Sequence, residues 1–330
     1  MEYVPYRNDL LPALVAYWNP SFADRPNFFP ITPEIFRARV VEKANQVERF
    51  NPEDLILAVE SDGKAPTVRG MVHVGRRSEA FCRAAFPGWG GGEQGYVAFL
   101  HVRPESRGRG VGAKLWDLGL ARLAGTVRTV LDTQCLNPFY GNSEGPATPF
   151  WGSPEGIGLL RDDEPTRRFF SRRGHLPRFE GFQFSADLAA ADPGPPERTR
   201  EALAANGLGL RTSSDLYPEV GARWGTQVRF SARTPFTVHA LIEGEMVRGL
   251  ICTYPLAEVG PGIHGIYETL LAEGWQGKGL GTVLVREAVR DLKARGGRRC
   301  DVLTIPGFTP AGLRLYAAAG FRRTASWSIY

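Results

Sequence analysis

A six-residue signature occurs twice in this sequence and constrains the fold more than any other feature. The first copy, Arg107–Gly112, follows the apolar stretch Tyr96–Val102, and the second, Gln276–Gly281, follows Ile266–Leu271. Each has the pattern Arg/Gln-x-x-Gly-x-Gly and opens a run with the periodicity of an amphipathic helix. Glycines let the backbone turn its amides inward, and a helix N-terminus adds partial positive charge, so such a loop can hold a pyrophosphate. Two copies in the same strand–loop–helix setting predict a duplicated phosphate-binding domain.

The length and composition fit a two-domain globular protein. The chain has 330 residues, of which 43% are hydrophobic and 23% are charged. No apolar run approaches the roughly 20 residues that a membrane span needs. The N-terminal residues Met1–Arg7 lack the basic start and apolar core of a signal peptide. We therefore expect a cytoplasmic protein without a membrane partner.

Charge and metal-binding residue types narrow the classes of function. The net charge of +5 is mild for this length, so nucleic acid is not an expected partner. The five histidines are dispersed and the four cysteines lack C-x-x-C spacing, which predicts reduced thiols and no metal site. We expect the densest basic cluster to be a solvated helix face, with contact to a cofactor phosphate as the alternative. The cluster consists of Arg161, Arg167, Arg168, Arg172, Arg173 and Arg178.

The predicted secondary structure repeats in the two halves. In the first half we expect helices over residues 9–19, 33–47, 113–123 and 166–173, and strands over 3–7, 55–60, 68–74, 96–102, 129–135 and 179–187. In the second half we expect helices over 215–230, 282–295 and 310–319, and strands over 208–211, 237–242, 246–254, 266–271, 300–305 and 324–329. Asn8 or Asp9 is expected to cap the first helix, and Thr32 the second.

A break in the pattern separates the halves. Asp192–Pro196 is rich in proline, and the helix predicted over residues 197–206 follows it. We therefore place an N-terminal domain at 1–190, a linker at 191–207 and a C-terminal domain at 208–330. Counted from the signatures, the first half is 23 positions longer, because Phe170 follows Arg107 by 63 positions and Tyr316 follows Gln276 by 40. The excess lies in the insertion 137–165, a long segment of the kind that is often functional.

With these motifs in place, the chain resembles the GNAT superfamily of acetyl-CoA-dependent N-acetyltransferases. Three segments carry the resemblance: Leu100–Pro104 with the loop that follows it, the loop Gln276–Gly281, and Leu315–Phe321, which matches a helix end of the form Leu-Tyr, three residues, Gly-Phe. The resemblance covers both halves. It implies an α/β (α+β) protein with two tandem GNAT-like domains, each a mixed, mostly antiparallel sheet flanked by helices.

The resemblance also implies acetyl-CoA as the cofactor. The loop amides would hold its pyrophosphate, and the strand before each loop would lie beside the pantetheine and offer a backbone N–H to the oxyanion. In the first half, the residues expected to bind it are Leu100, His101, Val102, Arg107, Gly108, Arg109, Gly110, Val111, Gly112 and Ala113. In the second half they are Thr269, Leu270, Leu271, Gln276, Gly277, Lys278, Gly279, Leu280, Gly281 and Thr282.

Acetyl transfer to an amine also needs an acid and a base. A free alkylamine has a pKa near 10.4 and must lose a proton, and the departing thiolate must gain one. The resemblance makes Tyr316 the candidate acid, with an ordinary core tyrosine as the alternative. Glu268, the one carboxylate in the strand before the second loop, is the candidate base. A structural salt bridge is the alternative for Glu268, and His264 is the fallback base.

The first half departs from the family pattern. Phe170 stands where the helix-end tyrosine is expected, and His175 replaces the phenylalanine of Gly-Phe. We therefore expect the second half to carry the chemistry, and the first half to bind cofactor, shape the acceptor site, or both. Candidate bases in the first half are Glu93, His73 and His101. Tyr140 is a candidate acid, and a surface aromatic is the favoured alternative for it.

Two other functions stay open at this point. Gly108–Ala113 also fits a dinucleotide-binding fingerprint, with Asp132 about 20 residues on. That fingerprint should follow the first strand of its domain, whereas this loop follows a late one. Alternatively, one or both halves bind acyl-CoA without turnover. For an enzyme, the expected partner is a small-molecule amine or peptide acceptor, and monomer and homodimer are both compatible with the sequence.

Overall fold

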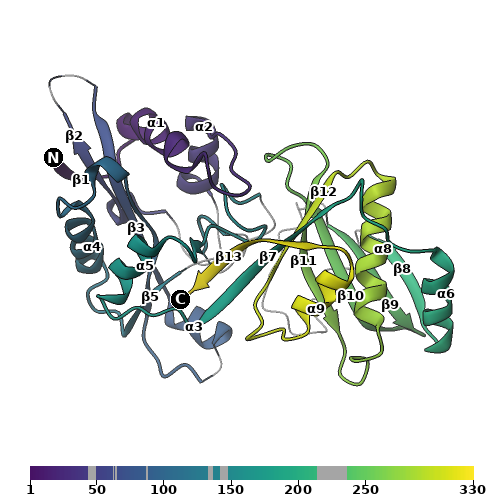
Figure 1. Cartoon of the computed structure of the whole chain (residues 1–330). Helices are drawn as coiled ribbons and strands as arrows, with labels where there is room; N and C mark the ends of the chain where they lie inside the picture. The colour runs from purple at the N-terminus through teal and green to yellow at the C-terminus, as the bar shows by residue number, and fades with distance from the viewer. Residues whose placement is uncertain are drawn as a thin grey trace.

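Two β-sheets flanked by helices organise the chain in this computed structural model (Figure 1). The structure describes residues 1–43, 50–61, 63, 65–86, 88–132, 137–141, 148–213 and 236–330. Both sheets are mixed: most neighbouring strands are antiparallel, and each sheet has one parallel pair. The predicted α/β class and mostly antiparallel sheets are confirmed.

The first sheet has the strand order β1-β2-β3-β4-β5. Its strands are β1 (Glu2–Pro5), β2 (Leu55–Glu60), β3 (Thr67–Arg77), β4 (Gln94–Val102) and β5 (Arg128–Leu131). The helices of this half are α1 (Leu11–Phe22), α2 (Pro33–Phe36), α3 (Glu79–Ala85), α4 (Val111–Arg122) and α5 (Glu164–Ser171). A π-helical turn over Arg37–Val41 continues α2, and short 3-10 turns cover Asn8–Leu10, Pro52–Asp54 and Pro104–Ser106.

The second sheet has the strand order β6-β13-β7-β12-β11-β10-β9-β8. Its strands are β6 (Leu159–Leu160), β7 (Phe179–Asp187), β8 (Gly209–Ser213), β9 (Thr237–Glu243), β10 (Met246–Pro255), β11 (Ile263–Leu271), β12 (Arg299–Thr304) and β13 (Arg322–Ile329). The helices of this half are α6 (Pro196–Ala205), α8 (Leu280–Ala294) and α9 (Gly312–Ala318).

Most predicted elements are found within a few residues of their predicted ends. Thr32 caps α2 as expected, because its side chain accepts a hydrogen bond from the amide of Ile35. The predicted cap of α1 is wrong: neither Asn8 nor Asp9 caps it, and the 3-10 turn leads directly into Leu11. Helix α3 was not predicted. The helix expected over 215–230 and the final residues of the strand expected over 129–135 lie outside the described residues.

Strand β7 differs most from the sequence analysis, which assigned it to the first half. It pairs with β12 and β13 in the second sheet, and Figure 1 shows it (teal) between them. The short strand β6, from the insertion, pairs with β13 at the edge of the same sheet. The first half thus supplies two strands to the second sheet, while the domain limits at 190 and 208 stay a prediction.

Candidate functional site

The two signature loops have the same backbone geometry. Gly110 and Gly279 have φ angles of 80° and 75°, in the left-handed region that favours glycine, and each immediately precedes the helix that follows its loop. No side chain caps the first turn of either helix. The first-turn amides are therefore open to an anion, at the end of the helix where the dipole is positive.

Each loop is also tied to its strand in the same way. The Arg107 side chain donates from Nε to the carbonyl oxygen of Val102 over 2.9 Å, and the Gln276 side chain donates from Nε2 to that of Leu271 over 3.4 Å. In both halves the side chain of the first signature residue is therefore hydrogen-bonded to the last residue of the preceding strand.

A β-bulge lies at the same distance before each loop. The register shifts at Ala98 in β4 and at Tyr267 in β11, each nine residues before the first signature residue. Parallel pairing with the next strand ends at the residue before each bulge, at Val97 in β4 and at Ile266 in β11. A bulge bends its strand, so β4 and β5 diverge beyond it, as do β11 and β12. In each half we call the point where the parallel pairing ends the opening, and in the first half a cavity reaches this point at Val97, Ala98 and Leu131.

The bulge in β11 also determines on which face of the sheet the adjacent side chains of this strand lie. Tyr267 packs in the cluster with Cys252, and Glu268 is the ladder partner of Cys252, so both lie on that face. Thr269, one residue on, lies on the opposite face with α8 and α9. Simple alternation from Tyr267 would place Glu268 on the α8 face; the bulge turns it to the other.

Tyr316 reaches the opening of the second half from α9. Its hydroxyl donates a hydrogen bond to Thr269 Oγ1 over 3.1 Å, and its ring is 5% exposed. Burial raises the pKa of Tyr316 to about 12, against a smaller lowering by Thr269. Tyr316 and Glu268 therefore lie on opposite faces of β11, next to the opening, and the phenol stays protonated at neutral pH.

The first half has apolar side chains at the matching positions. Phe99 lies eight residues before Arg107, just as Glu268 lies eight residues before Gln276. Leu100 and Thr269 are the next residues in these two strands and therefore also occupy matching positions. Phe170 and Tyr316 each lie four residues before the glycine that ends their helix. The carboxylate, hydroxyl and phenol of the second half are thus all replaced by hydrocarbon.

Two adjoining cavities lie along β4 in the first half. The larger, of about 420 Å³, follows the loop and is lined by eight of the ten cofactor residues predicted there. Arg109 and Val111 do not line it, and Val111 is instead buried in the core under α4. The smaller cavity, of about 90 Å³, shares Leu100, His101 and Thr166 with the larger one and extends to Asp132. Together they form a path from the loop into the β4–β5 opening.

Four residues that line the larger cavity were not predicted as cofactor residues: Pro165, Thr166, Phe169 and Arg173. Arg173 belongs to the basic cluster for which contact with a cofactor phosphate was the alternative. Phe169 and Arg173 line it from α5 and the turn that follows, and the Arg173 guanidinium carbon lies 3.7 Å from the centre of the Phe169 ring. Their spacing of four residues, which places side chains on one helix face, was the available signal. One arginine of the basic cluster thus lies at the loop rather than on a solvated face.

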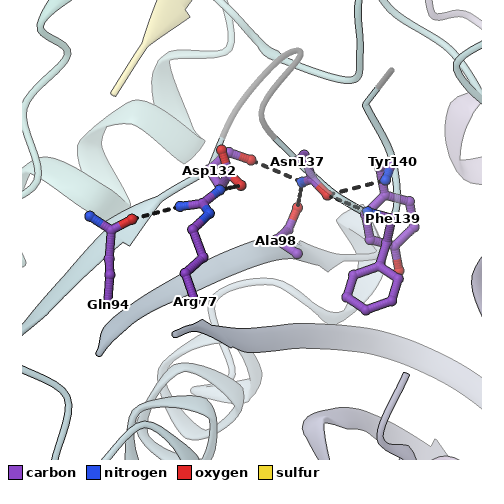
Figure 2. A network of polar contacts seen from close by, with 7 residues as sticks. All are labelled: Arg77, Gln94, Ala98, Asp132, Asn137, Phe139 and Tyr140. Atoms are coloured by element: carbon purple, nitrogen blue, oxygen red, sulfur yellow. Dashed lines mark hydrogen bonds and ion pairs between the residues drawn. The ribbon is translucent and has the colours of Figure 1, made fainter. Parts of the chain in front are cut away.

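Asn137 closes the deep end of the β4–β5 opening (Figure 2). Its Nδ2 donates to the carbonyl oxygens of Ala98 (2.7 Å) and Asp132 (2.9 Å), and its Oδ1 accepts from the amides of Phe139 and Tyr140. The side chain therefore replaces the ladder hydrogen bonds that the diverging strands lose. Beside it, Asp132 forms an ion pair with buried Arg77, so Asp132 does not stand free as the fingerprint residue of a dinucleotide site.

His101 is held in one neutral form at the junction of the two cavities. Burial, reinforced by Arg107, Arg25 and Arg103, lowers the pKa of His101 to about 3. The Arg107 guanidinium can only donate, so His101 Nε2, which lies 3.4 Å from it, is the acceptor and carries no proton. The proton of the neutral ring is therefore on Nδ1, which donates it to the Tyr17 hydroxyl over 2.5 Å. Tyr17 in turn donates to the His101 carbonyl oxygen over 3.1 Å. A base this weak is a poor candidate to deprotonate an amine.

The other candidate bases and the candidate acid of the first half also have structural partners. His73 is buried, and its Nδ1 lies 3.0 Å from the Tyr140 hydroxyl; burial lowers the pKa of His73 to about 3 and raises that of Tyr140. Glu93 is exposed and pairs with Arg76. The expectation that Tyr140 is a surface aromatic is wrong, because it is buried in an aromatic core with Trp18 and Phe150. The candidate acid Tyr140 also lies outside the residues that line the two cavities.

In the second half, the predicted cofactor residues surround the loop between β11 and α8. Thr269, Leu270 and Leu271 end the strand, and the loop residues Gln276–Gly279 are exposed. Lys278 places its ammonium 4.5 Å from the centre of the Trp275 ring. Leu280 is fully buried beneath α8, as Val111 is beneath α4.

A comparison with protein families agrees with this duplicated geometry. The sequence pattern of the Acetyltransferase (GNAT) family matches residues 16–138 and 210–321, one stretch in each half. The chain belongs to this family. Membership shows acyl transfer as the class of activity, with acetyl-CoA or another acyl-CoA as the general cosubstrate. No curated protein matches the sequence.

Solved structures of GNAT proteins resemble this fold at low sequence identity. One is a glucosamine N-acetyltransferase region of a fungal multi-domain GH3 β-N-acetylglucosaminidase (17% identity, TM-score 0.68), which covers 99% of this chain. Another is a tandem GNAT protein from the clavulanic acid biosynthesis pathway (16% identity, TM-score 0.60, 99% of this chain and 96% of that one). A third is a GCN5-related N-acetyltransferase from Sphaerobacter thermophilus (15% identity, TM-score 0.58, 99% and 93%). The chain spans 37% of the length of the fungal protein.

None of the helices in the described ranges is long and apolar enough to cross a membrane. The same ranges contain no group of three or more histidine, cysteine and acidic side chains placed to hold a metal ion.

Proposed function

We propose that this GNAT protein transfers an acetyl group from acetyl-CoA to a primary amine, and that the second half carries the chemistry. One observation carries the proposal: Glu268 and Tyr316 lie on opposite faces of β11 beside the β11–β12 opening, while the first half has Phe99 and Phe170 instead. The loop residues fit the cofactor, because two left-handed glycines and an uncapped helix N-terminus form an anion cradle.

The two side chains divide the proton transfers. Acetyl-CoA, when bound, supplies a thioester whose acetyl group passes to the amine nitrogen. Glu268 accepts, directly or through a water, the proton that the amine must lose. Tyr316 holds a proton at Oη and gives it to the sulfur as the carbon–sulfur bond breaks. From the ammonium form, the nitrogen loses two protons, one before it attacks the thioester and one as the tetrahedral intermediate collapses. One proton is delivered to sulfur by Tyr316, which is then reprotonated by exchange with water, and the other leaves through Glu268 to solvent, so the reaction yields amide, thiol and one free proton.

Thiol release from acetyl-CoA over a panel of primary amines tests this function. We expect amine-dependent release that Glu268→Gln slows, with little change in the affinity for acetyl-CoA. The matched control is Glu245→Gln, which alters an exposed carboxylate in the β9–β10 turn. Absence of amine-dependent release with every acceptor would instead favour a protein that binds acyl-CoA without turnover.

For the first half, we propose cofactor binding without acetyl transfer. The cavity of about 420 Å³ along its loop supports binding, and the apolar residues at all three matched positions argue against proton transfer. Calorimetry with acetyl-CoA should count two sites per chain. Turnover that survives Tyr316→Phe but disappears with a first-half loop variant would reverse the assignment of the two halves.

A further inference from the structure

The smaller cavity of the first half lies where the second half has its candidate catalytic groups. Phe99, Leu100 and Phe170 occupy the positions of the second-half carboxylate, hydroxyl and phenol, and all three line this cavity. The replacements therefore remove polar groups and also form part of the wall of an apolar space. Such a wall favours a hydrocarbon group over an amine, because an amine would lose its hydrogen bonds to water there.

The smaller cavity extends through the opening from one face of the first sheet to the other. Phe170 and Leu131 belong to the apolar cluster with α4, whereas Phe99 and Trp151 belong to the aromatic cluster with α1. All four side chains line the same cavity. The cavity therefore joins the two faces at the point where the pairing of β4 with β5 ends.

The insertion of the first half supplies one wall of this cavity. Trp151 and Ile157 are buried in it, and Leu159 and Leu160 reach it from strand β6. The Trp151 ring stacks on Phe22 of α1, with ring centres 5.2 Å apart and planes at 19°. The insertion therefore covers the Phe99 side of the opening, the side on which the second half has its candidate base.

The charged side chains in the wall of the smaller cavity already have partners. Arg25 Nη2 lies 3.5 Å from Asp163 Oδ2, and Asp132 forms its ion pair with buried Arg77 (Figure 2). A charged ligand group in this cavity would have to compete with an existing ion pair and lose its own hydration. An apolar group would meet hydrocarbon and neutralised charge.

The two cavities form one path from the signature loop. The larger cavity follows the loop and the end of β4 as far as Leu100, and the smaller one continues from Leu100 to Val97. An acyl-CoA, the general cosubstrate of the family, has its parts in the same order: an anionic pyrophosphate, a long uncharged arm and a terminal acyl group. With the pyrophosphate at the loop, the acyl group is the part that enters the smaller cavity.

We propose that the first half binds an acyl-CoA whose acyl group is an apolar chain of about four carbons, with the pyrophosphate at Arg107–Gly112 and the chain in the smaller cavity. The volume sets the length: an apolar cavity of about 150 Å³ holds benzene, so one of about 90 Å³ holds roughly four carbon atoms. This inference rests on the proposed cofactor binding by the first half and is independent of the chemistry assigned to the second.

Calorimetry with acyl-CoA thioesters of increasing length tests the inference on the full chain. The chain carries Gly279→Ala, which impairs the second loop and leaves the first intact. We expect butyryl-CoA to bind about tenfold or more tightly than acetyl-CoA, because burial of each added methylene group strengthens binding about fourfold. Octanoyl-CoA, whose chain exceeds the cavity, should bind no more tightly than butyryl-CoA. Equal affinities for acetyl-CoA and butyryl-CoA would overturn the inference.

Loop and cavity variants locate the preference for butyryl-CoA. Gly110→Ala should abolish it, and so should Leu131→Phe, which enlarges a buried side chain at the opening. The matched control Val127→Phe adds the same ring at an exposed position outside both cavities and should keep the preference. A preference that survives Gly110→Ala would belong to the second half and overturn the inference, and this comparison decides the location even if Leu131→Phe does not fold.

Succinyl-CoA distinguishes an apolar occupant from an anionic one, because it has the same four carbons but ends in a carboxylate. We expect it to bind the first-half site more weakly than butyryl-CoA, and tighter binding would overturn the apolar assignment in favour of a charged group held by Arg25. Failure of the proposed function gives different results. A single calorimetric site in the wild-type chain would contradict cofactor binding by the first half, and with it this inference, whereas absence of amine-dependent thiol release would contradict only the chemistry of the second half.

Discussion

One oxygen atom distinguishes Tyr316 from its counterpart Phe170, and in the proposed function that atom carries the proton for the departing thiolate. The Tyr316 hydroxyl is fixed by Thr269 beside the opening, whereas the Phe170 ring packs against Trp116 and Tyr330. A buried phenol with its pKa raised to about 12 stays protonated at neutral pH, so it can donate a hydrogen bond to the negative charge that develops on the departing sulfur.

Removing this hydroxyl should mainly affect the chemical step. Tyr316→Phe keeps the ring in the core and should lower kcat by about 10²–10⁴, the usual contribution of a general acid, with little change in acetyl-CoA affinity. Because the pKa is about 12, the wild-type kcat should show no alkaline decline from this group until the pH approaches 12. A kcat that is unchanged in the variant would leave Tyr316 as a core residue.

Buried histidines should make the fold sensitive to acid. Burial lowers the pKa of His73 to about 3 from its ordinary value of 6.5, so between these pH values the unfolded chain binds a proton that the folded protein refuses. The stability that follows from a neutral His73 is present above pH 6.5 and is lost as the pH falls toward 3. Urea midpoints at pH 7.5 and 4.5 should differ less for His73→Gln than for the wild type. An equal difference would contradict the lowered pKa.

At the scale of elements, each opening exists because a bulge ends the pairing of two parallel strands. In the first half Asn137 supplies the hydrogen bonds that the strands lose (Figure 2). Asn137→Ala removes four hydrogen bonds from a fully buried position and should lower the free energy of unfolding by about 2–3 kcal/mol. Asn206→Ala, which removes a single bond at the end of α6, should cost less than about 1 kcal/mol. Similar losses for the two variants in chemical denaturation would argue against this role.

Substitution of a glycine in one signature loop should impair cofactor binding in that half alone. An alanine at Gly279 or Gly110 must adopt a left-handed conformation at a cost of about 1–2 kcal/mol, which favours a loop without the anion cradle. We expect Gly279→Ala to lower turnover, and Gly110→Ala to remove one calorimetric site while turnover persists. Gly125→Ala, at a φ of 90° after α4, controls for the strain alone. Equal effects of the two loop variants on turnover would contradict the division of labour.

The sequence predicts these elements well where the signal is local. Apolar alternation, Gly–Phe helix ends and the Thr32 cap are properties of a few neighbouring residues, and the strands, α9 and α2 follow from them. The bulges at Ala98 and Tyr267 have no such local signal, so the face of Glu268 was not predictable. The role of Asn137 depends on the carbonyl of Ala98, 39 positions earlier, which only the folded chain brings within reach.

At the scale of the whole molecule, the two halves share one sheet. Strand β7 was predicted by its apolar pattern, but its partners β12 and β13 are more than 100 residues away, and pairing at that distance leaves no trace in periodicity. Beyond the sheet, Arg39 pairs with Glu258, and Leu303 and Trp327 of the second half pack into the aromatic core of the first. The two similar halves are thus interlocked.

Because the halves are interlocked, we expect that the C-terminal domain placed at 208–330 will not fold alone. Residues 208–330 lack β6 and β7, so β12 would keep β11 alone as a neighbour and β13 would have neither of its partners. The apolar face that Phe182 and Phe184 cover would also be exposed. We expect no cooperative thermal unfolding from 208–330, whereas 176–330, which adds β7 and α6, should unfold cooperatively. Because Leu303 and Trp327 still lack their first-half contacts, 176–330 should melt well below the full chain. A cooperative transition in 208–330 equal to that of 176–330 would show that β7 is dispensable and that the boundary near residue 190 marks an independent folding unit.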